Sequence, residues 1–221
     1  MAGNFKMMAK TLYGFEPILA KELRNLGASN VEEGVRNVSF EGDTGFMYKA
    51  NVCLRTALRV FRPIKTFRVF NEKDLYRHIY ELDWPGIFDV EKTFAIDSVT
   101  STKVFDNSMF VSLKAKDAIV DKFREIVRER PNVKTQDPDI RINIHIYNNT
   151  CTVSLDSSGN SLHQRGYRIL TNIAPINEVL AAGLLLKTGW DGQSNFFDPM
   201  CGSGTFLIEA AMIACNIPAN I

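Results

Sequence analysis

The stretch FDPMCGSGTF, residues 197–206, decides the fold of the C-terminal part of this chain. We predict a short buried strand over 194–199 and a helix over 204–215, separated by a turn that contains Gly-Ser-Gly. Such a unit is the first half of a nucleotide-type binding fold, because glycines let the backbone approach a ligand and a helix start offers unpaired N–H groups. One face of the predicted helix holds Leu207, Ala210, Ala211 and Ala214.

Three common glycine motifs do not match this turn. A Walker loop needs a lysine directly after the last glycine, and Thr205 stands there instead. A hydride-cofactor fingerprint, Gly-x-Gly-x-x-Gly, needs a third glycine, which is absent here. A nucleophile elbow needs Gly-x-Ser-x-Gly, whereas this turn reads Gly202-Ser203-Gly204. The alternative without a ligand is a plain tight turn around a buried cysteine. The octet DPMCGSGT at 198–205 is much rarer than an isolated Gly-Ser-Gly, and this favours a ligand site with Asp198 at the carboxyl end of a strand.

The composition sets broad limits on the class of protein. With 221 residues, 45% of them hydrophobic, the chain can bury the cores of one to three small domains. The 26 basic and 25 acidic residues leave a net charge of +1, so the overall charge gives no indication of nucleic-acid binding. No apolar run approaches the roughly 18 residues of a membrane span. No signal-like apolar segment stands at the start, so a cytoplasmic location without membrane partners is expected.

The cysteines predict neither a metal site nor disulfides. Cys53, Cys151, Cys201 and Cys215 form no Cys-x-x-Cys pair, and zinc sites usually need such spacing. We therefore expect no metal and reduced thiols.

Helix and strand patterns alternate along the whole chain and predict mixed α and β structure. The first 65 residues are close to a ferredoxin-like order of elements. In the helix predicted over 14–27, Pro17 suits the first turn and Gly27 the C-terminal cap. The other predicted helices cover 44–58, 71–84 with Asn71 as N-cap, 115–130 with Ile119, Phe123, Ile126 and Val127 on one face, and 171–190 with Pro175 in the first turn. The predicted strands cover 5–14, 35–43, 59–69, 93–101, 139–147 and 151–158, the last two joined by an Asn-Asn hairpin turn.

The segment DPMCGSGTFLIEAAMIA, residues 198–214, closely resembles motif I of the class I S-adenosylmethionine (SAM)-dependent methyltransferases. It is specifically similar to bacterial RNA methylases that carry a THUMP domain, the family of the 23S rRNA guanine-N2 methyltransferases. LDSSGNSLHQRGYR at 155–168 resembles the family's junction between the THUMP and catalytic domains, and APINEVLAAGLLLKTGW at 174–190 its helix before motif I. The resemblance extends over essentially the whole chain and is strongest from residue 155 onward.

The resemblance implies an α+β and α/β architecture of three parts. Residues 1–64 would form a ferredoxin-like N-terminal domain and residues 65–157 a THUMP domain, which is an RNA-binding module. Residues 158–221 would begin a Rossmann-like SAM-dependent methyltransferase domain.

The resemblance also implies which residues hold the cofactor S-adenosyl-L-methionine. Asp198 would lie near the methionine amino group, and the turn after it would supply backbone contacts. For Cys201, the alternative to a cofactor contact is that its side chain only packs against its neighbours. For Pro175 and Glu178, the alternative is that they only shape the start of a helix. The full expected set is Pro175, Asn177, Glu178, Asp198, Pro199, Cys201, Gly202, Ser203, Gly204 and Thr205.

Two segments are expected to contact RNA. In HQRGYR, at 163–168, Arg165 and Arg168 flank Tyr167, and guanidinium groups bind phosphate while aromatic rings stack on bases. In SVTSTKVF, at 98–105, hydroxyl groups and a lysine follow a strand and suit a phosphate backbone. A solvated loop is the alternative for both segments. The residues expected in the second segment are Thr100, Ser101 and Lys103.

Members of the family methylate a base amine with an Asn/Asp-Pro-Pro-Tyr/Phe motif, whose aromatic ring stacks on a flipped base. No such tetrapeptide occurs in this sequence, so no catalytic residue is assigned. We expect the N-terminal portion of an RNA methyltransferase acting on guanine N2 of 23S rRNA, which alone binds RNA without transferring methyl groups. The alternatives are a stand-alone RNA-binding module with a vestigial cofactor loop, and an amino-methyltransferase acting on tRNA or DNA.

Overall fold

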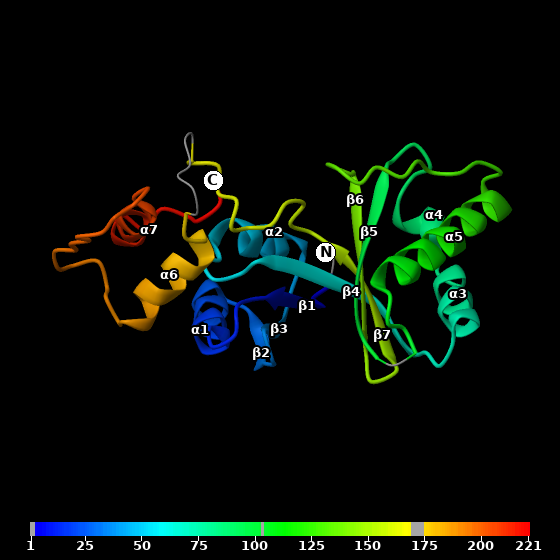
Figure 1. The fold of residues 1–221 in the computed structure, drawn as a ribbon, viewed down its shortest axis with the longest axis horizontal. Coiled ribbons are helices and arrows are strands. Elements are labelled where there is room, and N and C mark those ends of the chain that lie inside the picture. The colour runs from blue at the N-terminus through cyan, green and yellow to red at the C-terminus, as the bar shows by residue number, and fades with distance from the viewer. Residues whose placement is uncertain (1–2, 103, 169–174) are drawn as a thin grey trace. The chain divides into compact units, whose positions relative to one another are not determined.

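A computed structural model describes residues 3–102, 104–168 and 175–221 of the chain (Figure 1). The chain divides into two compact units. The first unit combines Met1–Val60 with Asn160–Ile221, and the second unit is Phe61–Gly159. Within the described ranges, no helix combines the length and apolarity that a membrane span requires.

The first unit contains an antiparallel sheet in the order β2-β3-β1. Buried side chains such as Met7, Phe40 and Leu23 form its core between the sheet and the helices. The predicted helix over 14–27 is confirmed, because Gly27 ends it at φ 102°. The elements of the first 60 residues of this unit are β1 (Phe5–Lys10), α1 (Glu16–Leu26), β2 (Ser29–Glu33), β3 (Asn37–Gly42) and α2 (Thr44–Cys53).

Two features of this unit differ from the sequence predictions. Strand β2 was not predicted, because four of its five residues are exposed and no apolar alternation marks it. The helix predicted over 44–58 ends at Cys53, where Leu54 turns to extended backbone. Residues from Leu54 to Ala57 then run through the core instead of continuing the helix, and both of these side chains are fully buried.

The described part of the second unit contains strands in the order β4-β7-β6-β5. The β5–β6 pair is parallel, and the β4–β7 and β6–β7 pairs are antiparallel. The strict alternation predicted for residues 139–147 is confirmed, since Ile142, Ile144 and Ile146 are fully buried. The predicted hairpin turn is also confirmed, with Asn148 and Asn149 at positive φ. Its elements are β4 (Arg59–Arg68), α3 (Glu72–Tyr80), α4 (Trp84–Ile87), β5 (Phe94–Ser101), α5 (Ser108–Ile126), β6 (Ile140–Tyr147) and β7 (Thr150–Asp156).

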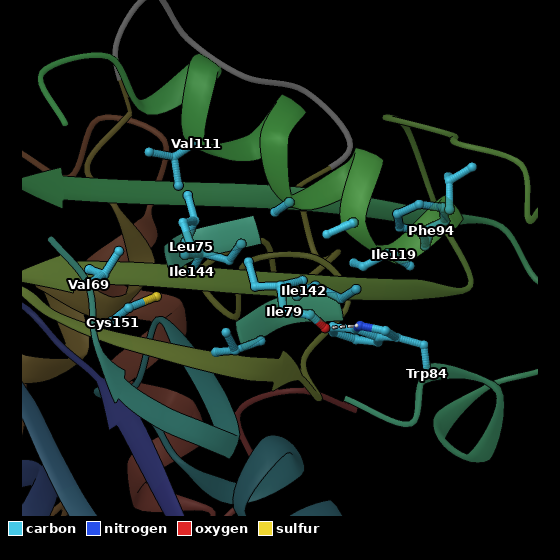
Figure 2. Close-up of a cluster of buried hydrophobic side chains, with 14 of the residues drawn as sticks. Val69, Leu75, Ile79, Trp84, Phe94, Val111, Ile119, Ile142, Ile144 and Cys151 are labelled. Atoms are coloured by element: carbon cyan, nitrogen blue, oxygen red, sulfur yellow. Dashed lines mark hydrogen bonds between the residues drawn. The ribbon is translucent and has the colours of Figure 1, made fainter. Parts of the chain in front are cut away.

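Helices α3 and α5 cover one face of this sheet, and the hydrophobic core lies between the sheet and these helices (Figure 2). Asn71 caps α3 as predicted, but the helix predicted to Trp84 ends at Tyr80. A separate short helix, α4, then begins at Trp84, whose indole N–H donates to the Ile79 carbonyl at 2.7 Å. Helix α5 begins seven residues earlier than predicted, because Asn107 caps it.

The predicted apolar face of α5 was wrong at its C-terminal end. Ile119 and Phe123 are fully buried, whereas Ile126 is 52% and Val127 38% exposed. The helix ends at Ile126, so these two side chains lie past the part of the helix that packs on the sheet.

Two helices, α6 (Glu178–Lys187) and α7 (Thr205–Ala214), return to the first unit and pack on each other. Helix α6 begins three residues after Pro175, so the prediction that this proline lies in its first turn was wrong. Gly183 lets the ring of Phe15 pack closely against α6, since a Cβ at this position would collide with that ring.

The strand predicted over 194–199 is absent from the described residues, and Phe197 is 85% exposed. A strand needs a hydrogen-bonded neighbour, and no described segment pairs with these residues. The predicted helix after it is confirmed as α7.

Candidate functional site

The loop between residues 198 and 204 is held by its own backbone. The Asp198 carboxylate accepts a hydrogen bond from the Met200 N–H at 3.0 Å, and the Gly204 N–H donates to the Cys201 carbonyl at 2.7 Å. Gly202 and Gly204 have φ of 54° and 77°, values that favour glycine. Nothing lies within 4 Å of where a Cβ of either glycine would stand. The loop therefore presents bare backbone to open space.

Helix α7 starts directly from this loop. Gly204 is its N-cap residue and has no side chain that could accept a first-turn N–H. The positive end of the helix dipole therefore stays available for an acceptor group of a ligand. Asp198 and Ser203 are half-buried beside it, while Pro199 and Cys201 are exposed. This arrangement suits a ligand that carries both a cationic group and hydrogen-bond acceptors.

A second group of predicted residues surrounds the start of α6. The Asn177 side chain caps that helix by accepting the Leu180 N–H at 3.1 Å, and Glu178 is buried. A pocket of about 450 Å³ opens here. Its described lining residues are His163, Gln164, Arg165, Gly166, Arg168, Pro175, Asn177 and Glu178.

Arg168 connects the starts of the two helices. One terminal nitrogen, Nη2, donates to Thr205 Oγ1 at 2.9 Å and to the Ile176 carbonyl at 2.5 Å. Its Nε lies 3.2 Å from the Glu178 carboxylate. The Thr205 hydroxyl in turn lies 3.4 Å from that of Ser203. Both predicted cofactor segments are therefore in contact with one guanidinium group.

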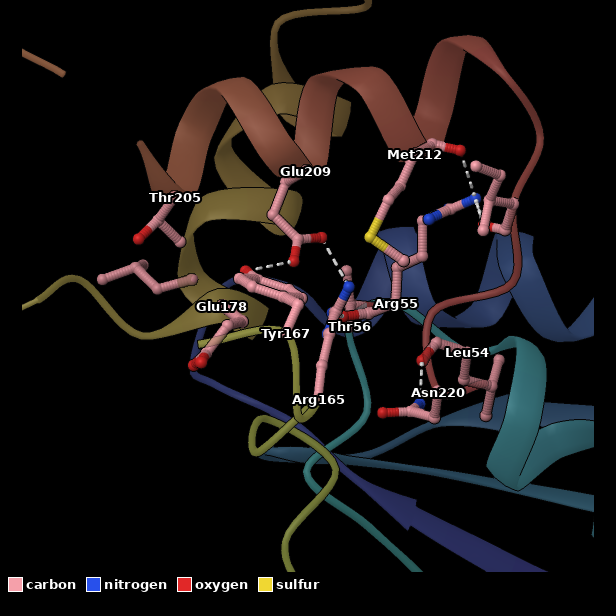
Figure 3. A network of polar contacts seen from close by, with 12 residues as sticks. Leu54, Arg55, Thr56, Arg165, Tyr167, Glu178, Thr205, Glu209, Met212 and Asn220 are labelled. Carbon is pink, nitrogen blue, oxygen red and sulfur yellow. Dashed lines mark hydrogen bonds and ion pairs between the residues drawn. The ribbon is translucent and has the colours of Figure 1, made fainter. Parts of the chain in front are cut away.

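A buried ion pair lies one turn further along α7 (Figure 3). Arg165 and Glu209 are paired at 2.5 Å, and their side chains are 1% and 0% exposed. The Tyr167 hydroxyl donates to the other Glu209 oxygen at 2.9 Å. Burial raises the pKa of Glu209, although Arg165 opposes this, and burial together with Glu209 raises the pKa of Tyr167. Tyr167 therefore keeps its proton and remains a donor.

The far end of α7 is also anchored to the first 60 residues. Arg55 donates to the carbonyls of Met212 at 3.1 Å and Ile217 at 2.6 Å, and Arg165 donates to the Arg55 carbonyl at 2.5 Å. The Asn220 backbone N–H donates to the Val52 carbonyl at 3.0 Å. The ferredoxin-like elements thus hold the helix that follows the glycine loop.

The residues predicted to bind RNA lie in two places. Arg165 is buried and its guanidinium is paired, which fits a structural role rather than the expected phosphate contact. Tyr167 and Arg168 are half-buried and hydrogen-bonded within the first unit.

The other predicted RNA segment lies at the end of β5 in the second unit. The Thr100 hydroxyl donates to the Phe105 carbonyl at 2.7 Å, and Ser101 is exposed. Lys103 lies outside the described residues.

The sequence analysis missed Glu209. A single charged residue within the apolar run FLIEAAMIA was the available signal, since a buried carboxylate needs a partner. The face of α7 predicted from its apolar residues was right at Ala210 and wrong at the other three positions. Thr205, Glu209 and Ala210 are buried, whereas Leu207, Ala211 and Ala214 are exposed. Nowhere in the described part of the chain do three or more His, Cys, Asp or Glu side chains gather as a metal site would require.

Three protein families match successive parts of the chain. The RlmL ferredoxin-like domain matches residues 6–61, and the THUMP domain matches residues 69–156. The RMKL-like methyltransferase domain matches residues 165–221. These matches confirm the predicted fold class.

Solved structures resemble the chain over nearly its whole length. A predicted N6-adenine-specific DNA methylase from Listeria monocytogenes is 31% identical, with a TM-score of 0.87 over 99% of this chain and 57% of the other. A possible methylase from Clostridium difficile 630 is 32% identical, with a TM-score of 0.88 over 99% of this chain and 58% of the other. A putative methyltransferase complexed with SAH is 33% identical, with a TM-score of 0.85 over 100% and 58%.

The chain spans 57% to 58% of the length of these related chains. TrmN from Thermus thermophilus shares only the fold, at 17% identity and a TM-score of 0.67. The succession of an RlmL ferredoxin-like domain, a THUMP domain and the start of an RMKL-like methyltransferase domain places this chain in the family of THUMP-containing methyltransferases, whose N-terminal portion it matches.

Proposed function

We propose that this chain is part of an RNA methyltransferase that transfers a methyl group from SAM to an exocyclic base amine of structured RNA, with guanine N2 of 23S rRNA as the target. The open glycine loop at 198–204, which leads into α7 with Asp198 beside it, is the observation that carries the cofactor part. A related structure complexed with SAH supports it. The THUMP match supports the RNA part, because THUMP is an RNA-binding domain.

The described residues fit SAM by their chemistry. SAM supplies a methyl group activated on a sulfonium, and its methionine end carries an ammonium group. The Asp198 carboxylate would accept from that ammonium, as a charge-assisted hydrogen bond. The bare backbone at Gly202 and Gly204 would lie against the cofactor, because neither residue has a side chain and nothing lies within 4 Å of an added Cβ. Cys201 would contribute its backbone groups beside them. Pro199, Ser203 and Thr205 would shape the loop, and Pro175, Asn177 and Glu178 would border the adjoining pocket.

The acceptor-orienting Asn/Asp-Pro-Pro-Tyr/Phe motif is not part of this sequence. The proposal therefore gives the chain two tasks, holding the cofactor and holding RNA through the THUMP domain with Thr100, Ser101 and Lys103. On this proposal the chain alone transfers no methyl group.

Transfer of a radiolabelled methyl group by the full-length protein tests the proposed substrate. Unmodified 23S rRNA, tRNA and DNA are offered separately, and the labelled nucleoside is identified after digestion. We expect label in N2-methylguanosine of 23S rRNA. Label in tRNA or in DNA adenine would contradict this assignment. The DNA outcome would agree with the name of the Listeria protein, a predicted N6-adenine-specific DNA methylase. If no substrate is labelled, the alternative of an RNA-binding module with a vestigial cofactor loop remains.

Asp198→Asn is expected to weaken SAH binding by about 10- to 100-fold, the equivalent of one hydrogen bond to a charged group. Asparagine keeps the side-chain oxygen that accepts the Met200 N–H, so the turn is retained while the charge is lost. Isothermal titration calorimetry with SAH measures the effect. Asp191→Asn is the matched control, because the Asp191 carboxylate accepts the Gln193 N–H at the same 3.0 Å. Equal affinity in the two variants would contradict a role for the Asp198 charge.

Gly204→Ala is expected to abolish measurable SAH binding, because its Cβ would occupy the space in which the ligand lies against the loop. Gly189→Ala is the matched control. Both glycines have φ of 77° and nothing within 4 Å of an added Cβ, so the strain of about 1 kcal/mol is common to both. Thermal unfolding should show similar losses in the two variants, while calorimetry with SAH separates them. Loss of binding in both would mean that strain, not the ligand, explains the result.

A further inference from the structure

Residues 163–168, which we name the arginine segment, contact helix α7 at two successive turns. Arg168 Nη2 donates to Thr205 Oγ1 at 2.9 Å, and Arg165 pairs with Glu209 at 2.5 Å. Thr205 and Glu209 stand four residues apart and therefore share one face of the helix. Both are buried, at 1% and 0% exposure. The arginine segment thus covers the polar face of α7, directly after the glycine loop.

The Arg168 contacts link this helix to α6. Its Nη2 also donates to the Ile176 carbonyl at 2.5 Å, and its Nε lies 3.2 Å from Glu178, whose side chain is 7% exposed. A guanidinium is planar and presents its donors in a fixed fork. One planar group therefore joins Thr205 to the start of α6.

We propose that Arg168 is a positioning residue for the cofactor loop. It acts through Thr205, the first residue of α7, and through that residue it sets the direction in which the loop and the helix N-terminus face the ligand. The proposal rests on the proposed function insofar as the ligand is SAM. It replaces the RNA contact expected from the sequence, because Arg168 is already engaged with three partners within the first unit.

The affinity arm of the test uses Arg168→Lys, Thr205→Val and the double variant in calorimetry with SAH. Lysine keeps the charge beside Glu178 but cannot reproduce the fork, and valine replaces the Thr205 hydroxyl with a methyl group of similar size. We expect each single variant to weaken SAH binding by roughly tenfold, the value of one charge-assisted hydrogen bond. The double variant is expected to be no weaker than Arg168→Lys alone, since the two changes remove the same contact. Arg24→Lys is the control, because Arg24 lies in the same unit on an exposed surface.

Losses that multiply in the double variant would overturn the proposal, because they would mean that Arg168 touches the ligand independently of Thr205. Unchanged affinity in both single variants would overturn it as well. If Arg168→Lys does not fold, Thr205→Val still tests the contact, because it leaves the ion pair with Glu178 intact.

Amide hydrogen exchange on the ligand-free protein provides an arm that does not depend on SAM. In Arg168→Lys and in Thr205→Val, we expect faster exchange in peptides that cover 199–208 and unchanged exchange in peptides of β1 and α1. Unchanged exchange over 199–208 would overturn the positioning role. A wild-type chain that fails to bind SAH would instead contradict the proposed function, and the exchange result would still decide the role of Arg168.

Discussion

Glu209→Ala is expected to destabilise the first unit by about 3–5 kcal/mol, because it leaves the Arg165 guanidinium buried without its counter-charge. The Tyr167 hydroxyl would lose its acceptor in the same step. Urea denaturation followed by tryptophan fluorescence measures the change in a Trp84→Phe background, in which Trp190, in the first unit, is the one remaining tryptophan of the two.

Two further variants test whether the unpaired buried charge of Arg165 causes this loss of stability. Glu33→Ala removes an exposed carboxylate, 3.9 Å from Arg24, and should cost less than about 1 kcal/mol. The double variant Arg165→Leu with Glu209→Leu removes both charges and is expected to regain most of the lost stability, because apolar pairs often replace buried ion pairs without loss. A loss below about 1 kcal/mol in Glu209→Ala would show that water reaches the pair and screens it.

Trp84→Ala is expected to cost the second unit about 3–5 kcal/mol, the range for emptying a buried aromatic position. The Trp84 side chain is fully buried in the core of the second unit, and its ring meets that of Phe88 edge-on. Its indole N–H donates to the Ile79 carbonyl (Figure 2). Losing that hydrogen bond adds a further cost of about 1 kcal/mol. Chemical denaturation followed by far-ultraviolet circular dichroism should show the transition of the second unit moved to lower denaturant.

Phe70→Ala is the control for this prediction. Phe70 belongs to the same unit and is 60% exposed, so its removal should change stability by less than about 0.5 kcal/mol. Trp84→Phe keeps an aromatic ring and loses the donor, and it should fall between the two. If Trp84→Ala and Phe70→Ala had equal effects, the core around α4 would be less tightly packed than the structure indicates.

The sequence alone determined those elements whose signals are local. Alternating isoleucines over residues 140–146 predicted strand β6, and the Asn148–Asn149 turn predicted the hairpin after it. Pro17 and Gly27 marked the two ends of α1. Each signal arises from the conformational preference of a few neighbouring residues, so no distant part of the chain is needed to interpret it. The motif at 198–214 likewise pointed to the methyltransferase family that the comparisons show.

Contacts between distant segments decided the rest. Strand β2 exists because β3 pairs with it, and residues 194–199 form no strand because no described segment offers them a partner. The buried face of α7 is a polar one, since Arg165 and Arg168 approach it from a segment about 40 residues earlier. Hydrophobic periodicity assigns polar residues to water. Only the tertiary structure could place Thr205 and Glu209 inside, because burial of a polar side chain depends on a partner that the local sequence does not contain.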